Sequence, residues 1–261
     1  MVAVRALRTV RVTRYVTPLR EGGSLPAIVE ADDDGLYVLK FRGAGHGVKA
    51  LVAELVSGEI ARALGLPVPE LVFAEIDRDL ARTEPDPEIH ALIHDSAGQN
   101  LALDFLPGSI AYDPVVQRPA ASLASRIVWF DAYVSNVDRT ARNTNMLVWH
   151  KRPWLIDHGA TLYFHHAPGW TAETARRARE PFKGLKDHVL LRHASELPAA
   201  DAELAQALSP ERIEGILAHV PDAWLVEDGL SPADVRRAYS DYLQLRVAAP
   251  RRFVEEALGA R

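Results

Sequence analysis

The chain has 261 residues, 48% hydrophobic and 25% charged, which is an ordinary globular composition and a length that suits a two-lobed domain. Its net charge of −5 argues against a basic surface, so we expect no direct nucleic-acid binding. The absence of cysteine excludes disulfides, thiolate zinc sites and a cysteine nucleophile. No apolar stretch is long enough to span a membrane, so we expect a cytoplasmic protein without a membrane partner.

Strands dominate the first hundred residues. The first twenty residues carry five arginines and no acid, which could indicate a transit peptide, but residues 8–16 alternate in polarity as a strand does. The general preference for arginine over lysine is typical of a GC-rich bacterial genome. An acidic turn at 31–35 precedes a strand in which Leu36, Val38 and the aliphatic part of Lys40 share one face. Predicted strands cover residues 8–16, 25–30, 36–41, 71–76 and 101–106.

The later elements are mostly helical. A helix is predicted over residues 49–64 and ends at Gly65, and residues 77–88 are predicted to be a loop. After Pro107 and Gly108 the pattern changes to a helix over residues 123–135, an irregular segment at 136–145, a hairpin turned by residues 151–153, and helices from residue 171 onward. This order predicts an α+β, two-lobed, protein-kinase-like fold, with a small β-rich N-lobe at residues 1–106 and a helical C-lobe at residues 107–261.

One lysine stands out within the apolar strand 36–41. An unpaired ammonium is costly there, so Lys40 needs a carboxylate partner, unless its side chain reaches solvent from the end of the strand. Glu54, on the next helix, is the expected partner, and Glu59 is an alternative that the spacing leaves open. A strand lysine held by a helix glutamate is the arrangement with which kinases bind the α- and β-phosphates of ATP.

Two loops carry the most informative constellation. Asp138 is followed by Asn143 five residues later, and a hairpin then leads to Asp157 in an Asp-His-Gly sequence. Phosphoryl transfer needs a carboxylate that orients the attacking hydroxyl, together with oxygen ligands that hold Mg²⁺ against the phosphates. Each loop alone has a plain structural explanation as a polar turn. Their combination predicts Asp138 as the catalytic base and Asn143 and Asp157 as metal ligands.

Two further segments are candidate nucleotide contacts. Gly22, Gly23 and Ser24 lie between two predicted strands and could surround phosphates with backbone N–H groups, although such a turn is also a common hairpin connection. The apolar strand that ends before Pro107 should join the lobes. We expect the backbone of Asp104, Phe105 and Leu106 to bind the adenine edge.

At these positions the sequence resembles the HipA-like kinases and, more loosely, the phosphatidylinositol kinases, over roughly residues 20–165. The resemblance implies that Lys40 binds phosphate, Glu54 pairs with it, Asp138 is catalytic, and Asn143 and Asp157 hold metal. The chain departs from the family at the residues after the catalytic aspartate, Arg-Thr, where members often carry histidine. The matching segments are Tyr37-Val-Leu-Lys-Phe41, the helix with Glu54, Leu64-Gly-Leu-Pro-Val-Pro69, Asn136-x-Asp138-x4-Asn143 and Asp157.

The resulting functional hypothesis is a kinase that uses ATP and Mg²⁺ to phosphorylate a hydroxyl of a protein or a small molecule. A second possibility is a kinase-fold enzyme that performs other chemistry on a natural-product intermediate, such as dehydration or cyclisation, because a fold does not fix a reaction. A third is a non-catalytic nucleotide-binding module, against which the joint presence of Lys40, Asp138, Asn143 and Asp157 argues.

Overall fold

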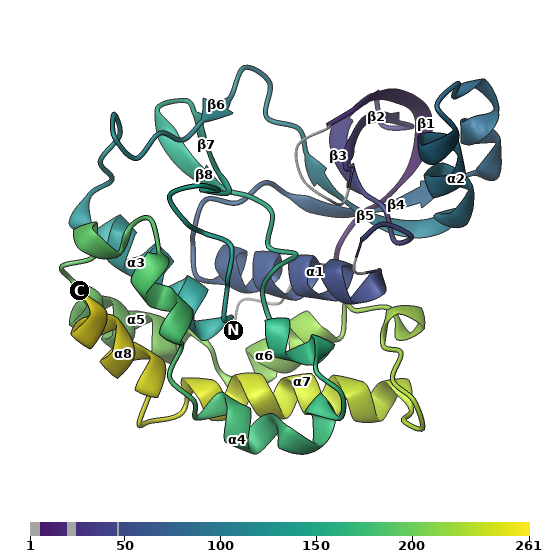
Figure 1. The fold of residues 1–261 in the computed structure, drawn as a ribbon. Coiled ribbons are helices and arrows are strands. Elements are labelled where there is room, and N and C mark those ends of the chain that lie inside the picture. Colours follow the sequence, from purple (N-terminus) through teal and green to yellow (C-terminus); the bar gives the residue numbers. More distant parts are fainter. Residues whose placement is uncertain (1–5, 20–24, 46) are drawn as a thin grey trace.

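A closed five-stranded β-barrel forms the first part of the chain (Figure 1). The computed structural model describes residues 6–19, 25–45 and 47–261. The strand order is β1-β2-β3-β5-β4, and all neighbours are antiparallel except β1 and β4, which are parallel. The five strands are β1 (Thr9–Pro18), β2 (Ala27–Ala31), β3 (Leu36–Lys40), β4 (Leu71–Ile76) and β5 (Gly98–Asp104).

The alternation of side chains along the strands separates two hydrophobic clusters. Tyr37 and Leu39 on β3 point into the barrel, where they pack with Val72 of β4. Leu101 and Leu103 on β5 point the other way and join the larger cluster of the helical part. Lys40, two residues after Val38, therefore leaves the barrel on its outer face.

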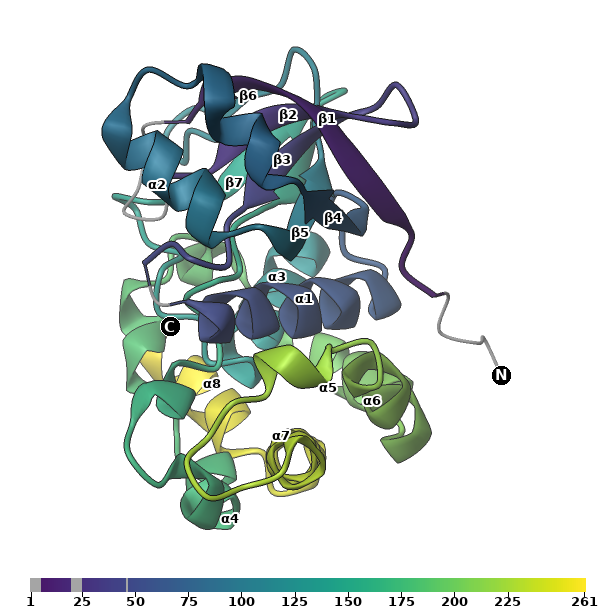
Figure 2. The same cartoon turned by 90° about the vertical axis from the view of Figure 1, so that its right-hand side faces the viewer.

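Helix α1 (Val48–Ala63) lies between the barrel and the C-terminal helices (Figure 2). Every residue from Leu51 to Ala61 is buried, which explains why its apolar side chains do not keep to one stripe. The helix ends as predicted, because Gly65 adopts φ 70° and the Leu66 N–H bonds back to the Ala61 carbonyl. Its apolar residues belong to the same cluster as those of the later helices.

The helical part contains α3, five later helices and a small sheet ordered β6-β7-β8. Short 3₁₀ segments connect the helices. In the part of the chain that the structure describes, no helix is both long and apolar enough to cross a membrane. The elements are β6 (Ile110–Ala111), α3 (Ala121–Tyr133), β7 (Met146–Trp149), β8 (Arg152–Leu155), α4 (Thr174–Ala178), α5 (Leu197–Ala207), α6 (Pro210–Leu217), α7 (Pro232–Val247) and α8 (Arg252–Ala260).

Two local predictions are wrong. Residues 77–88 are not a loop: they hold a 3₁₀ helix (Arg78–Thr83) and the start of α2 (Pro87–Asp95). Asp77 and Asp86 cap these helices with their side chains, a signal that the polar, proline-containing composition concealed. The hairpin turns at His150 and Lys151, both at positive φ, rather than at residues 151–153.

Candidate active site

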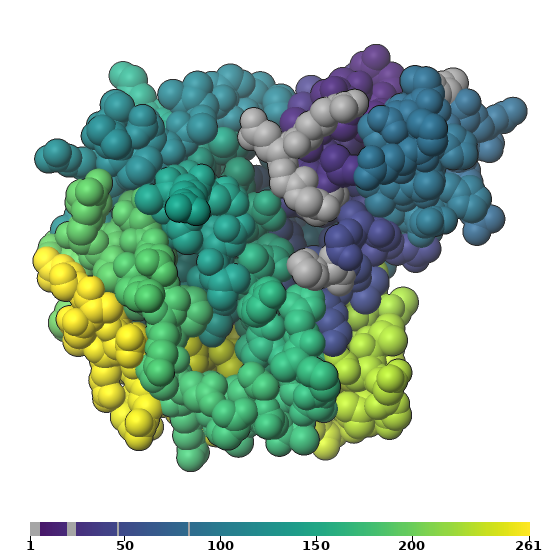
Figure 3. All heavy atoms as spheres, viewed as in Figure 1, coloured from purple at the N-terminus to yellow at the C-terminus, as the bar shows by residue number. Residues whose placement is uncertain are grey.

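A cleft between the barrel and the helical part brings together residues from three distant segments. Lys40 enters it from β3, Asp138 and Asn143 from the loop after α3, and Asp157 from the loop after β8. The pocket has a volume of ≈ 290 Å³. Tyr163 also lines this pocket. Figure 3 shows the face on which the barrel, in purple and blue, meets the teal and green segments of the helical part.

Lys40 is the basic centre of the cleft. Its Nζ donates a hydrogen bond to Asp157 Oδ1 at 2.7 Å and lies 3.8 Å from Glu54 Oε2. Burial alone lowers the pKa of Lys40, but the carboxylates of Glu54 and Asp157 outweigh it and raise the pKa above its ordinary value. The ammonium therefore stays charged, as a phosphate-binding group requires. The alternative partner, Glu59, instead pairs with Arg62.

Glu54 is held from a second side by a histidine. Its Oε1 lies 3.4 Å from Nδ1 of His158, and both residues are 1% exposed. Burial raises the pKa of Glu54, but Lys40 and His158 outweigh burial, so the pKa is lowered and the carboxylate remains charged. The His158 ring also packs edge-on against Phe130, with ring centroids 5.6 Å apart. Glu54 thus lies between Lys40 and the residue that follows Asp157.

Asp138 is oriented by three asparagines. Its Oδ2 accepts hydrogen bonds from Asn143 Nδ2 at 2.8 Å and from Asn145 Nδ2 at 3.0 Å. Asn145 Nδ2 also donates to the Asp138 carbonyl, and the Asp138 N–H donates to Asn136 Oδ1. Among the described residues, Oδ1 of Asp138 has no hydrogen-bond partner. One carboxylate oxygen is therefore fixed while the other remains available to an acceptor hydroxyl.

The loop that carries Asp138 is anchored to a buried carboxylate on α3. Asp131, fully buried, accepts hydrogen bonds from Asn136 Nδ2 at 2.7 Å, Arg139 Nε at 2.5 Å and His188 Nε2 at 2.9 Å. The Leu190 N–H donates to Nδ1 of His188, which leaves the proton on Nε2 to face Asp131. Burial raises the pKa of Asp131, but the charge of Arg139 and the bonds from His188 and Arg139 outweigh burial and hold it well below its usual range.

Sequence reasoning did not assign a role to these supporting residues. Asn136 could have been singled out by its place in the motif Asn-x-Asp, and Asn145 by its position two residues after Asn143. Asp131 and His188 are 57 residues apart, and no local pattern predicts their contact.

The metal-binding prediction fits the donors that the cleft contains. Asp157 adopts φ 55°, and the preceding Ile156 N–H bonds to the Asn145 carbonyl, which places the carboxylate in the same pocket as Asn143. Carboxylate and amide oxygens are ligands that Mg²⁺ prefers, and this ion usually keeps water and phosphate oxygens as its other ligands. The described residues contain no group of three His, Cys, Asp or Glu side chains that could hold a metal ion by themselves.

Fewer backbone groups of residues 104–106 are available for the predicted adenine contact than the sequence suggested. The N–H of Asp104 donates to the Glu70 carbonyl, and the N–H of Phe105 donates to the Leu36 carbonyl, both at 2.9 Å. Neither amide is free to bind adenine. The segment does lie beside the strand of Lys40, because residues 101–104 of β5 pair with residues 37–40 of β3. The Leu106 N–H and the backbone carbonyls are the groups that still fit the prediction.

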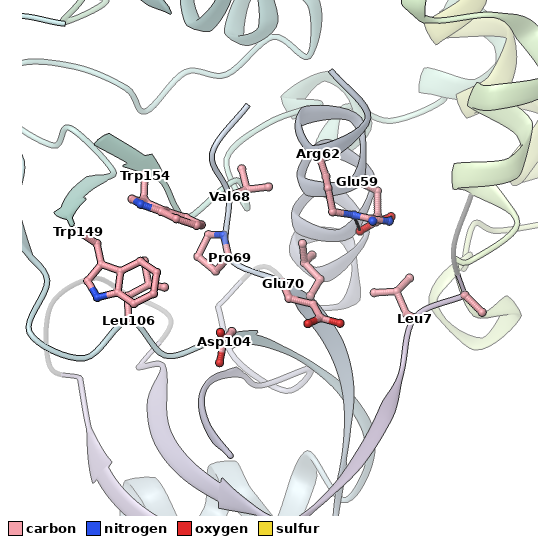
Figure 4. A pocket seen from close by; sticks show the side chains of 12 residues that line it. Leu7, Glu59, Arg62, Val68, Pro69, Glu70, Asp104, Leu106, Trp149 and Trp154 are labelled. Atoms are coloured by element: carbon pink, nitrogen blue, oxygen red, sulfur yellow. Dashed lines mark hydrogen bonds and ion pairs between the residues drawn. The ribbon is translucent and has the colours of Figure 1, made fainter. Parts of the chain in front are cut away.

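A second pocket, of ≈ 360 Å³, lies beside this connecting segment and apart from the cleft residues (Figure 4). Trp149 and Trp154 lie at one side of this pocket, and Glu70 and Asp104 lie between them and Leu7 at the other side. Burial and the neighbouring Glu70 raise the pKa of Asp104. The side chains of Asp104 and Leu106 thus line this second pocket, so any adenine contact by this segment must come from its backbone. Gly22, Gly23 and Ser24 lie outside the described residues, and their predicted role stays a prediction.

Comparison with known proteins finds a matching family model and similar solved structures. A sequence model of the HipA-like kinases matches residues 12–245, and no curated protein matches the chain. The crystal structure of a Helicobacter pylori proinflammatory kinase, CtkA, superposes on this chain with a TM-score of 0.53 at 13% sequence identity. The match covers 85% of this chain and 94% of that chain, and it shows that the two share a fold. A Golgi casein kinase with Mn/ADP bound has a TM-score of 0.38 at 12% identity, covering 96% of this chain and 75% of its own.

Proposed function

Because the chain belongs to the HipA-like kinase family and is a phosphotransferase, we propose that it transfers the γ-phosphate of ATP, with Mg²⁺, to a hydroxyl of a protein or a small molecule. The observation that carries this proposal is the meeting of Lys40, Asp157 and Asp138 in one pocket. A cation for the phosphates, a metal ligand and a base are the three kinds of group that phosphoryl transfer needs.

Each residue has a distinct proposed task. Lys40, kept charged by Glu54, binds the α- and β-phosphates. Asp157 and Asn143 would hold Mg²⁺, which neutralises charge on the phosphates when it is bound. Asp138 uses its free Oδ1 to accept a hydrogen bond from the acceptor hydroxyl and to receive its proton as the phosphoryl group leaves ATP. The amide bonds to Oδ2 keep Oδ1 in place during this step.

The larger architecture of the proposal is two lobes, residues 1–106 and 107–261, with the nucleotide between them. The backbone at Leu106 is the proposed adenine contact, and Gly22, Gly23 and Ser24 the proposed phosphate loop. The buried Glu54 lies on α1, whose apolar residues belong to one cluster with barrel residues Leu101 and Leu103 and with the later helices.

Thermal stability with ATP and Mg²⁺ tests this proposal without knowledge of the acceptor. A ligand at 100 times its dissociation constant stabilises a protein by about 2.7 kcal/mol. We expect ATP with Mg²⁺ to raise the melting temperature of the wild type more than ATP with EDTA, and Asp157→Ala to lose the Mg²⁺-dependent part. Asp241→Ala, at an exposed position on α7, is the matched control and should keep it. An unchanged shift in Asp157→Ala would remove Asp157 from the metal site.

A further inference from the structure

Two fully buried hydroxyls connect α1 with the loop that carries Asp157. Ser57 Oγ on α1 lies 2.6 Å from Thr161 Oγ1, and both residues are 0% exposed. Thr161 Oγ1 also lies 2.7 Å from the His158 carbonyl oxygen and 3.3 Å from the Ala53 carbonyl oxygen. Three oxygen atoms from α1 and from the Asp157 loop thus converge on one threonine side chain.

The number of protons sets the direction of these bonds. A threonine hydroxyl donates only one hydrogen bond. Of the two carbonyl oxygens near the Thr161 hydroxyl, that of His158 is closer than that of Ala53, so the bond is assigned to His158. Ser57 then donates to Thr161 Oγ1, which accepts. The resulting chain runs from α1 through Thr161 to the backbone carbonyl of His158, the residue directly after Asp157. Asp157, the neighbour of His158, is a non-glycine residue at φ 55°, a conformation that persists only where surrounding contacts enforce it.

Other contacts hold α1 in the same way. Lys49, in its first turn, donates to the His165 carbonyl at 2.7 Å and pairs with Glu227. Glu54 lies 3.4 Å from His158, one turn before Ser57. The helix is therefore fastened along its length to residues of the helical part, whereas Lys40 belongs to the barrel.

We propose that Thr161 is a positioning residue, which fixes the register between the helix of Glu54 and the loop of Asp157. This inference rests on the proposed function, because it gives Asp157 and Glu54 their tasks. With the register fixed, the lysine partner and the metal ligand form one rigid body. Lys40, on β3, contacts both of these carboxylates.

Variants at position 161 separate the hydroxyl from the packing. Thr161→Val removes the hydroxyl and keeps the branched shape, and Thr161→Ser keeps the hydroxyl. Ser125→Ala is the matched control, because Ser125 is also fully buried but its Oγ accepts a bond from the Glu196 N–H, away from the cleft. Two measurements are needed: the Mg²⁺ concentration that gives half of the ATP-dependent thermal stabilisation, and amide hydrogen exchange over residues 48–63 without nucleotide.

We expect Thr161→Val to raise the half-saturating Mg²⁺ concentration about tenfold, the usual effect of losing one buried hydrogen bond, and to speed exchange in α1. Thr161→Ser should restore both, and Ser125→Ala should change neither, although it lowers the melting temperature. A Thr161→Val protein that behaves like Ser125→Ala in both measurements would overturn the inference. A wild type without any Mg²⁺-dependent stabilisation would refute the proposed function instead, and the exchange measurement would still decide the role of Thr161.

Discussion

Among the polar positions of the helical part, Asp131 should be the one whose substitution lowers the stability of the protein most. Its Oδ2 accepts from Arg139 and His188, and its Oδ1 accepts from Asn136, so Asp131→Ala leaves three buried donors without their acceptor. Breaking a buried ion pair on one side costs about 3–5 kcal/mol, because the other charge stays buried and unpaired. Arg139 meets this condition, with a side chain that is 0% exposed.

That loss is large enough to measure in a melting experiment. For a chain of this size, 1 kcal/mol shifts the melting temperature by about 2–4 °C, so Asp131→Ala should melt roughly 6–20 °C below the wild type. Asp131→Asn keeps the shape but not the charge, and should lose most of the same stability. Glu173→Ala, which breaks exposed ion pairs with Arg176 and Arg177, should melt close to the wild type. An Asp131→Ala protein that melts with the wild type would refute the reasoning.

Two further predictions concern charge in the buried networks. The pKa of Asp131 is depressed in the fold, so its stabilising effect should be complete above its unfolded pKa of about 3.9 and be lost as the pH falls through the lower, folded value. The difference in unfolding free energy between wild type and Asp131→Asn should therefore be constant from pH 5 upward and narrow below about pH 4; a gap that widens on acidification would contradict this. Glu54→Gln should lower ATP-dependent turnover at least about tenfold, because Lys40 loses a charged partner. Glu59→Gln, at a similarly buried position on the same helix, should leave turnover near that of the wild type, because Glu59 pairs with Arg62. Equal effects of the two glutamine variants would show that the choice of partner is wrong.

Local patterns predicted most of the fold that places the cleft. Alternating polarity located β1, short apolar runs located β2 and β5, and Gly65 marked the end of α1, because these signals depend on neighbouring residues. The 3₁₀ helix Arg78–Thr83 and α2 were missed because their caps, Asp77 and Asp86 respectively, are residues that are also typical of loops.

The candidate site divides in the same way. The need of Lys40 for a carboxylate could be predicted, since an ammonium in an apolar strand is costly, but the choice between Glu54 and Glu59 comes from the structure. The support for Asp138 could not be predicted, because His188 reaches Asp131 only through tertiary packing. Hydrogen bonding of the Asp104 and Phe105 amides likewise depends on strands that the sequence does not align.

Transfer of label from γ-labelled ATP tests the central claim most directly. A panel of proteins and hydroxyl-bearing small molecules serves as acceptors, with Asp241→Asn as a matched control. We predict that Asp138→Asn keeps Mg²⁺-dependent ATP stabilisation and lowers label transfer by roughly 100- to 10,000-fold, the range for a positioned acid–base group. Full transfer by Asp138→Asn would contradict the proposed mechanism, even if ATP still binds.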